Sequence, residues 1–328
     1  MNEHTPSAPL SHLGPQWFAP VMGWGGLGLA WHRAADGFGD EADTLATACA
    51  LLAAAVFLSV LLASLLRWAR HPRALAEDLR HPVRHAFAAA LPVSLIILAT
   101  NAVALLGPQS WMVLPWAAGV LLQSVVLVWV VARWFSGRKQ WPGVTPVLYI
   151  PVVGNVLVPL AGVPLDYPMV SWFFFGIGMF FWPVLTAMLL VRQVLHPMPD
   201  RLLPSWFIMI APPAVGALSA TSLGASPELA MAGLGVAVLS ATAAASRVPG
   251  IARQPFAMPF WAMSFPVTAL AALLLRLAHP VPALAIPGIA VLAIASVLIL
   301  GLTLATLKGL RAGTLLAPEP AVPIAPSN

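Results

Sequence analysis

The chain has 328 residues, of which 60% are hydrophobic and only 8% are charged. A soluble domain carries about a quarter charged residues, so this composition excludes a soluble globular protein and indicates an all-α polytopic membrane protein. The single cysteine, Cys49, excludes a disulfide framework and a thiolate metal cluster. The net charge of +5 does not indicate nucleic-acid binding, because the basic residues are scattered through short loops instead of forming one face or arm.

The first residues, MNEHTPSAPLSH, lack the basic region and the cleavage site of a secretory signal, so we expect the first apolar segment to be a retained membrane span. A hydrocarbon core of about 30 Å requires about 20 apolar residues per helix. This length predicts ten spans, at residues 15–33, 44–66, 85–106, 111–132, 146–163, 171–191, 204–222, 228–246, 258–276 and 284–307. We therefore expect a short cytoplasmic tail at 1–14, a transmembrane domain at 15–311 and a Pro/Ala-rich tail at 312–328.

The basic residues lie mainly on one side of this ten-span topology. Fourteen of the 16 Lys and Arg residues fall on the side of the two termini, and only Arg33 and Arg276 fall on the other side. The positive-inside rule then places both termini in the cytoplasm. A wrong number of spans would have placed many basic residues on both sides of the membrane, so their uneven distribution supports ten spans. The abundance of Arg, Ala and Pro suits a bacterial protein, which indicates the inner membrane.

Helix-breaking residues are concentrated at depth in the odd-numbered spans. They include Pro20 with Gly23 in the first span, and then Pro92, Pro151, Pro212 and Pro266. An interior proline removes a backbone hydrogen bond, which lipid tolerates only where protein or a watery cavity covers the freed group. The alternation predicts five helical hairpins, with kinked inner helices around a cavity and smoother outer helices facing lipid. The alternative is that Gly and Pro are simply common in membrane helices.

No charged residue falls in the middle of any predicted span, and all eight histidines lie in tails, loops or span ends. This pattern predicts no metal site, no cofactor and no catalytic constellation, so the protein is not expected to be an enzyme. A neutral pore with a basic cytoplasmic vestibule would admit anions rather than cations. A carrier of uncharged solutes would have a similar pattern, so composition alone leaves both open.

Six segments, in order along the predicted spans, resemble one known family. They are WFAPVMGWGGLGLAW (17–31), HPVRHAFAAALP (81–92), TPVLYIPVVGN (145–155), FFGIGMFFW (174–182), IAPPAVG (210–216) and FWAMSFP (260–266). Together they resemble the tellurite-resistance/dicarboxylate transporter family, which includes the bacterial tellurite-resistance channel homologue and the plant guard-cell slow anion channel. The similarity extends from about Trp17 to about Lys308. The long phosphorylated tails of the plant channels are missing, so kinase control of that kind is not expected.

The resemblance implies ten helices, arranged as five hairpins with quasi-fivefold order, and a homotrimer with a pore in each protomer. It also implies that a phenylalanine of the ninth helix plugs the pore, and the family pattern Trp-Ala-x-Ser/Thr-Phe places that plug at Phe265. By the same matches, the pore kinks correspond to Pro20, Pro92, Pro151, Pro212 and Pro266.

The residues around Phe265 and at the entry of the third span are further candidates. Helical spacing aligns Trp261, Phe265, Thr268 and Ala272 on one face, and Ser264 and Thr268 are expected to line the pore. Arg84 and His85 are candidates for the cytoplasmic vestibule, although Arg84 would equally serve as a snorkelling anchor. Tyr149 and Asn155 are expected either to bond kinked backbone or to line the pore.

The leading hypothesis is a gated anion channel or uniporter for small anions such as chloride or nitrate. The alternative is a secondary carrier or exporter of C4-dicarboxylate, sulfite or tellurite-type oxyanions. A purely structural membrane protein would not need deep helix breaks. The expected partners are small inorganic or carboxylate anions, membrane lipid and two further copies of the chain, with no nucleic acid.

Overall fold

The computed structural model describes residues 9–136 and 143–317, and this part of the chain is helical and contains no strand. Eight of its helices are long and apolar enough to cross a membrane, as expected for a polytopic membrane protein. Parts of the two predicted tails, residues 1–8 and 318–328, lie outside the described residues. So do Arg138 and Lys139, two of the basic residues expected on the side of the termini.

Five long, smooth helices form the outside of the bundle. They are α2 (Asp40–Arg70), α5 (Val113–Phe135), α8 (Pro168–Leu195), α10 (Pro227–Ala245) and α13 (Ala285–Arg311). Only 17–33% of the most apolar part of each is buried, and many large apolar side chains are exposed. A helix that stays apolar on its exposed face is suited to contact with lipid. One of these helices, α8, contains a proline in its interior, Pro183.

A second set of helices forms the inside of the bundle, and most of their residues are buried. They are α1 (Ala19–Phe38), α4 (Ala90–Leu106), α6 (Tyr149–Val153), α7 (Val158–Gly162), α9 (Ala211–Ser222) and α12 (Ser264–Leu277). Each of these inner segments follows a stretch of 3₁₀ helix. These stretches are η2 (Pro15–Phe18), η3 (Arg84–Ala89), η6 (Pro146–Leu148), η7 (Gly154–Leu157), η8 (Asp200–Ile210) and η9 (Met258–Met263). Short connectors complete the described chain: η1 (Pro9–His12), α3 (Pro72–Arg80), η4 (Ser110–Met112), α11 (Val248–Ile251) and η10 (Pro282–Leu284).

The prolines of the inner helices mark the change from 3₁₀ to α geometry. Pro20, Pro92, Pro151, Pro212 and Pro266 each occupy the second or third position of an α segment. Proline is tolerated in the first turn because the N–H that it lacks would have no partner within the helix. The sequence predicts kinks inside α-helices; the structure instead places these prolines where a tighter helix ends and an α-helix begins.

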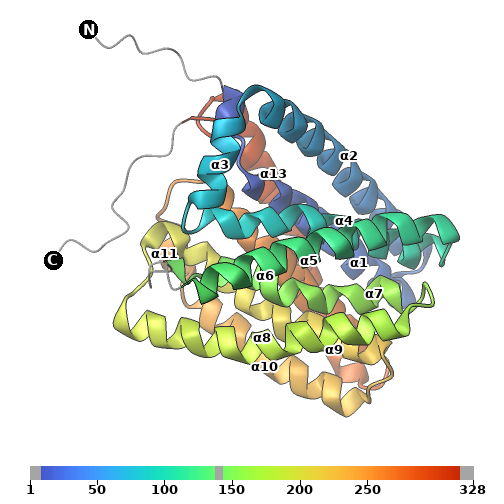
Figure 1. Cartoon of the computed structure of the whole chain (residues 1–328). Helices are drawn as coiled ribbons and strands as arrows, with labels where there is room; N and C mark the ends of the chain where they lie inside the picture. Colours follow the sequence, from blue (N-terminus) through green and yellow to red (C-terminus); the bar gives the residue numbers. More distant parts are fainter. Residues whose placement is uncertain (1–8, 137–142, 318–328) are drawn as a thin grey trace, which may run out of the picture.

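Each inner helix packs against the outer helix that follows it in the chain. The pairs are α1 with α2, α4 with α5, α6 and α7 with α8, α9 with α10, and α12 with α13. The inner helices also contact one another in succession, from α1 to α4, α7, α9 and α12, and from α12 back to α1 (Figure 1). These contacts leave the inner faces of the α1, α4, α6–α7, α9 and α12 segments turned toward a common axis.

Eight of the predicted spans coincide with the eight long apolar helices. The span predicted at 15–33 falls on η2 and α1. The span predicted at 146–163 falls on Pro146–Gly162, a shorter apolar stretch that is divided into 3₁₀ and α pieces. Those two segments are the ones in which glycines and prolines interrupt the apolar sequence most densely.

The side chain of Gln123, which is fully buried in α5, holds the divided segment in place. Its Nε2 donates hydrogen bonds to the carbonyl oxygens of Ile150 and Pro151, at 3.0 and 2.9 Å. These carbonyls lie where the α6 turn gives way to η7, so a partner from a neighbouring helix satisfies them.

Gln123→Leu should therefore destabilise the protein by about 1–3 kcal/mol, because the Ile150 carbonyl loses its side-chain donor and the Pro151 carbonyl keeps only the long 3.5 Å bond from Nδ2 of Asn155. Thermal unfolding in detergent would measure the loss. Ser124→Ala is the matched control, since the Ser124 hydroxyl bonds only to the Val120 carbonyl of its own helix. Equal melting temperatures for the two variants would contradict the bridging role of Gln123.

Candidate functional site

Three cavities follow one another along the axis of the inner helices. The basic cavity, of about 290 Å³, lies at the ends where the inner segments begin. The central cavity, of about 60 Å³, shares the lining residues Phe87 and Ala262 with it. The far cavity, of about 220 Å³, shares Leu157, Val215 and Phe265 with the central cavity. The shared lining residues place the three cavities in a row from one end of the inner helices to the other, and we call this row the path; its smallest cavity lies in the middle.

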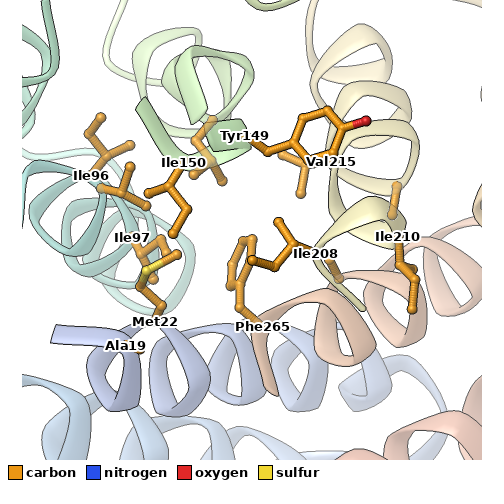
Figure 2. Close-up of a cluster of buried hydrophobic side chains, with 14 of the residues drawn as sticks. Ala19, Met22, Ile96, Ile97, Tyr149, Ile150, Ile208, Ile210, Val215 and Phe265 are labelled. Carbon is orange, nitrogen blue, oxygen red and sulfur yellow. The ribbon is translucent and has the colours of Figure 1, made fainter. Parts of the chain in front are cut away.

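The walls of the central cavity are almost entirely apolar. Met22 from α1, Ile150 from α6, Ile208 from η8 and Val215 from α9 contribute to them. Figure 2 shows the Phe265 ring in the space that these segments enclose, beside Ile208. A narrow apolar constriction excludes ions because it offers them no ligands to replace their water.

Phe265 lines both the central cavity and the far cavity, as Leu157 and Val215 also do, and the residue is 8% exposed. The ring lies directly against α1 at Gly26. A Cβ atom at Gly26 would approach Cδ2 of Phe265 to 2.9 Å and would clash with Oγ1 of Thr268. Glycine at this position therefore allows α1 to pack closely against the ring.

The face predicted from helical spacing follows the path. Trp261 lines the central cavity, and Thr268 and Ala272 line the far cavity. The hydroxyl of Thr268 donates to the carbonyl of Phe265 at 2.8 Å, next to the start of α12. Trp261 donates to Oγ1 of Thr306 at 2.9 Å, which ties η9 to α13.

Two of the residues predicted at the pore, Ser264 and Gly23, lie where α1 packs closely against α12. Ser264 is fully buried and donates to the carbonyl of Trp261, and a Cβ at Gly23 would meet its Oγ at 2.5 Å. These two residues form a close contact between α1 and α12 and are not among the described residues that line the cavities. Of the five predicted pore prolines, Pro212 and Pro266 line the central cavity. The described cavity linings do not include Pro20, Pro92 and Pro151.

The two vestibule candidates, Arg84 and His85, have different surroundings in the structure. Arg84 lines the basic cavity, and its Nη1 lies 3.3 Å from Oδ1 of Asp78 in α3. His85 is buried against Trp129, with Nδ1 2.9 Å from the carbonyl oxygen of His81. The His85 ring packs against Trp129 of α5, and His85 is not among the described residues that line the three cavities.

Tyr149 and Asn155, for which the sequence left two roles open, also have different surroundings. Tyr149 lines the central cavity, and its hydroxyl oxygen lies 2.6 Å from Oγ1 of Thr186 in α8. Asn155 is fully buried and donates through Nδ2 to the carbonyl of Val152 at 3.1 Å. Asn155 thus satisfies broken backbone, whereas Tyr149 combines pore lining with a bond to an outer helix.

Basic side chains line both ends of the path. The basic cavity is lined by His81, Arg84, Arg192 and Arg201, and the far cavity by His32 and Arg33. None of the described residues that line the three cavities is Asp or Glu. Such a distribution attracts anions and repels cations. Within the described ranges, no group of three or more His, Cys, Asp or Glu side chains is placed to hold a metal ion.

Sequence reasoning treated Arg192 and Arg201 only as markers of topology and missed that they line the basic cavity. A signal for Arg192 exists in the sequence. The buried face of α8 comprises Ser171, Gly178, Leu185, Leu189 and Arg192. Their spacing of three, four or seven residues places them on one helical face, which therefore ends in an inward-facing arginine.

Comparison with known proteins gives one family and several relatives. The model of the voltage-dependent anion channel family matches residues 12–307. An uncharacterized transporter of Methanocaldococcus jannaschii is 27% identical over 78% of this chain and 80% of its own length. A second uncharacterized transporter of that organism is 27% identical over 49% of this chain and 51% of its own. The S-type anion channel SLAH2 of Arabidopsis thaliana is 26% identical over 65% of this chain and 41% of its own length.

Proposed function

Because the chain belongs to the voltage-dependent anion channel family, we propose that it is a gated channel or uniporter that conducts small anions such as chloride or nitrate. The resemblance predicted from the six segments is confirmed by this membership. The protein is an integral membrane protein of a transporter and channel family, and its general role is anion transport.

The observation that carries the proposal is the row of three cavities with Phe265 between two of them. In the proposed mechanism, an anion enters the basic cavity, is attracted by the arginines there and meets the apolar constriction. The Phe265 ring closes this constriction by filling it and keeping it dry. Conduction requires the ring to move aside, after which the anion reaches the far cavity and Arg33.

We propose ten membrane crossings, arranged as five hairpins with quasi-fivefold order around this pore. The succession of contacts among the inner segments and the exposed apolar faces of α2, α5, α8, α10 and α13 support it. The transmembrane domain then comprises residues 15–311, between two tails. It lies in a bacterial inner membrane, with both termini in the cytoplasm. Three copies assemble through the outer helices, each with its own pore, and lipid covers the remaining outer surface.

Flux through reconstituted liposomes tests the proposal against its alternative. Purified protein is placed in vesicles whose membrane voltage is set by a potassium gradient, and chloride and nitrate efflux are followed. A channel releases anions in response to voltage and to the anion gradient, with no requirement for a pH gradient. Accumulation of C4-dicarboxylate, sulfite or tellurite driven by a pH gradient alone would identify a coupled carrier and overturn the channel.

A further inference from the structure

Arg192 is a buried cation without a protein partner in the part of the chain that the structure describes. Its residue is 2% exposed, and both Nε and Nη1 are buried without a hydrogen-bond acceptor. Buried polar atoms in folded proteins almost always have partners, and buried charges are paired or bind an ion. A guanidinium left in this state costs free energy, which a bound anion would recover.

The surroundings of Arg192 supply no carboxylate. None of the described residues that line the basic cavity is acidic. The other two arginines of this cavity differ from Arg192 in their ion pairing and exposure. Arg84 shares its charge with Asp78 through the 3.3 Å contact, whereas Arg201 is exposed and has no ion pair among the described residues. Of the arginines that line the basic cavity, Arg192 and Arg201 have no carboxylate partner among the described residues, and Arg192 is the one shielded from water.

We propose that the basic cavity is a binding site for a small oxyanion, a nitrate or carboxylate group, and that the guanidinium of Arg192 is its principal ligand. This inference rests on the proposed function only in placing the site at the mouth of a pore. A planar guanidinium presents several N–H donors in one plane and matches the oxygens of nitrate or carboxylate, whereas an ammonium acts as a point charge. The cavity of about 290 Å³ has room for a polyatomic anion.

The position of this site allows an anion to bind before it reaches the constriction. The basic cavity meets the central cavity at Phe87 and Ala262, so an anion at Arg192 lies one step before the apolar constriction. Gln16 and Gln254 also line the cavity, and their amide N–H groups are possible donors to an anion that is losing its water. Binding here raises the local anion concentration and favours oxyanions over halides before any passage occurs.

Calorimetric titration of the full-length protein in detergent, with sodium nitrate, acetate and chloride, tests the site. Arg192→Gln should weaken nitrate and acetate binding at least about tenfold, or about 1.4 kcal/mol. Arg192→Lys should keep chloride binding within about twofold and lose the preference for nitrate and acetate. Arg247→Gln is the matched control, because Arg247 is exposed, is predicted on the same side and does not line the described cavity; it should change affinity less than about twofold.

The result that would overturn the site is unchanged nitrate affinity in folded Arg192→Gln. An equal loss in Arg192→Gln and Arg247→Gln would overturn it as well, since it would indicate general surface charge. If Arg192→Gln does not fold, the comparison of nitrate with chloride in Arg192→Lys decides the question. Binding does not depend on transport, so oxyanion binding at Arg192 without flux in liposomes would retain the site and reject the channel. Anion flux in liposomes together with unchanged nitrate binding in the Arg192 variants would support the channel and reject the binding site.

Discussion

Phe265→Ala should raise the anion current of the reconstituted protein at least tenfold, which corresponds to about 1.4 kcal/mol removed from the barrier. Phe265 lines both the central cavity and the far cavity, so we expect removal of its ring to join the two. The constriction becomes wider and can admit water, which lowers the cost of moving an anion through it. Current in planar bilayers, normalised to the amount of protein, is the measurement.

Phe260→Ala is the matched control for this prediction. Phe260 also belongs to the segment that leads into α12, but it lines the wide basic cavity and packs beside Phe256, with 5.5 Å between ring centroids. The same loss of a ring there should leave the current within about twofold, because the constriction is untouched. Similar currents in both variants would show that Phe265 does not close the path.

Asp78→Ala should lower the stability of the protein by about 3–5 kcal/mol, because it leaves a buried arginine without its counter-charge. Asp78 is 1% exposed, and its Oδ2 lies 2.6 Å from Nη2 of Arg67, which is 3% exposed. Its Oδ1 faces Arg84 at 3.3 Å. One carboxylate thus joins the end of α2, the surface helix α3 and the wall of the basic cavity.

The neighbouring Glu77 offers a control for Asp78. Glu77 is exposed in α3, so Glu77→Ala removes the same charge from the same helix without uncovering a buried partner. Its effect should stay within about 0.5 kcal/mol. Thermal unfolding in detergent compares the two variants, and a loss of equal size in both would mean that the pairing of Arg67 with Asp78 does not stabilise the fold.

Membrane physics explains how much of this fold could be predicted from the sequence. Eight of the predicted spans coincide with long apolar helices because a fixed hydrocarbon thickness imposes a minimum apolar length. The concentration of proline and glycine in odd spans matches their burial, since lipid does not tolerate freed backbone groups. The face through Trp261, Phe265 and Thr268 followed from helical spacing alone.

The features that could not be predicted depend on contacts between segments distant in the sequence. The position of a proline does not reveal that a 3₁₀ segment precedes it, so Pro266 was expected to kink an α-helix that in fact begins at Ser264. The sequence does not reveal that Gly23 of α1 packs against Ser264, so Ser264 was expected to line the pore. Arg192 resembled the other basic residues at span ends, because its helical face with Gly178, Leu185 and Leu189 identifies it as buried only once that face is known to turn inward.

The reversal potential of the Phe265→Ala protein in a planar bilayer with unequal chloride concentrations tests most directly whether the chain is an anion-conducting pore. An anion channel predicts a shift of about 59 mV for a tenfold gradient, with the sign of an anion. The same shift should follow a nitrate gradient and should not change when a pH gradient is imposed. A reversal potential that follows the cation, or that follows the pH gradient instead of the anion, would contradict the proposed function.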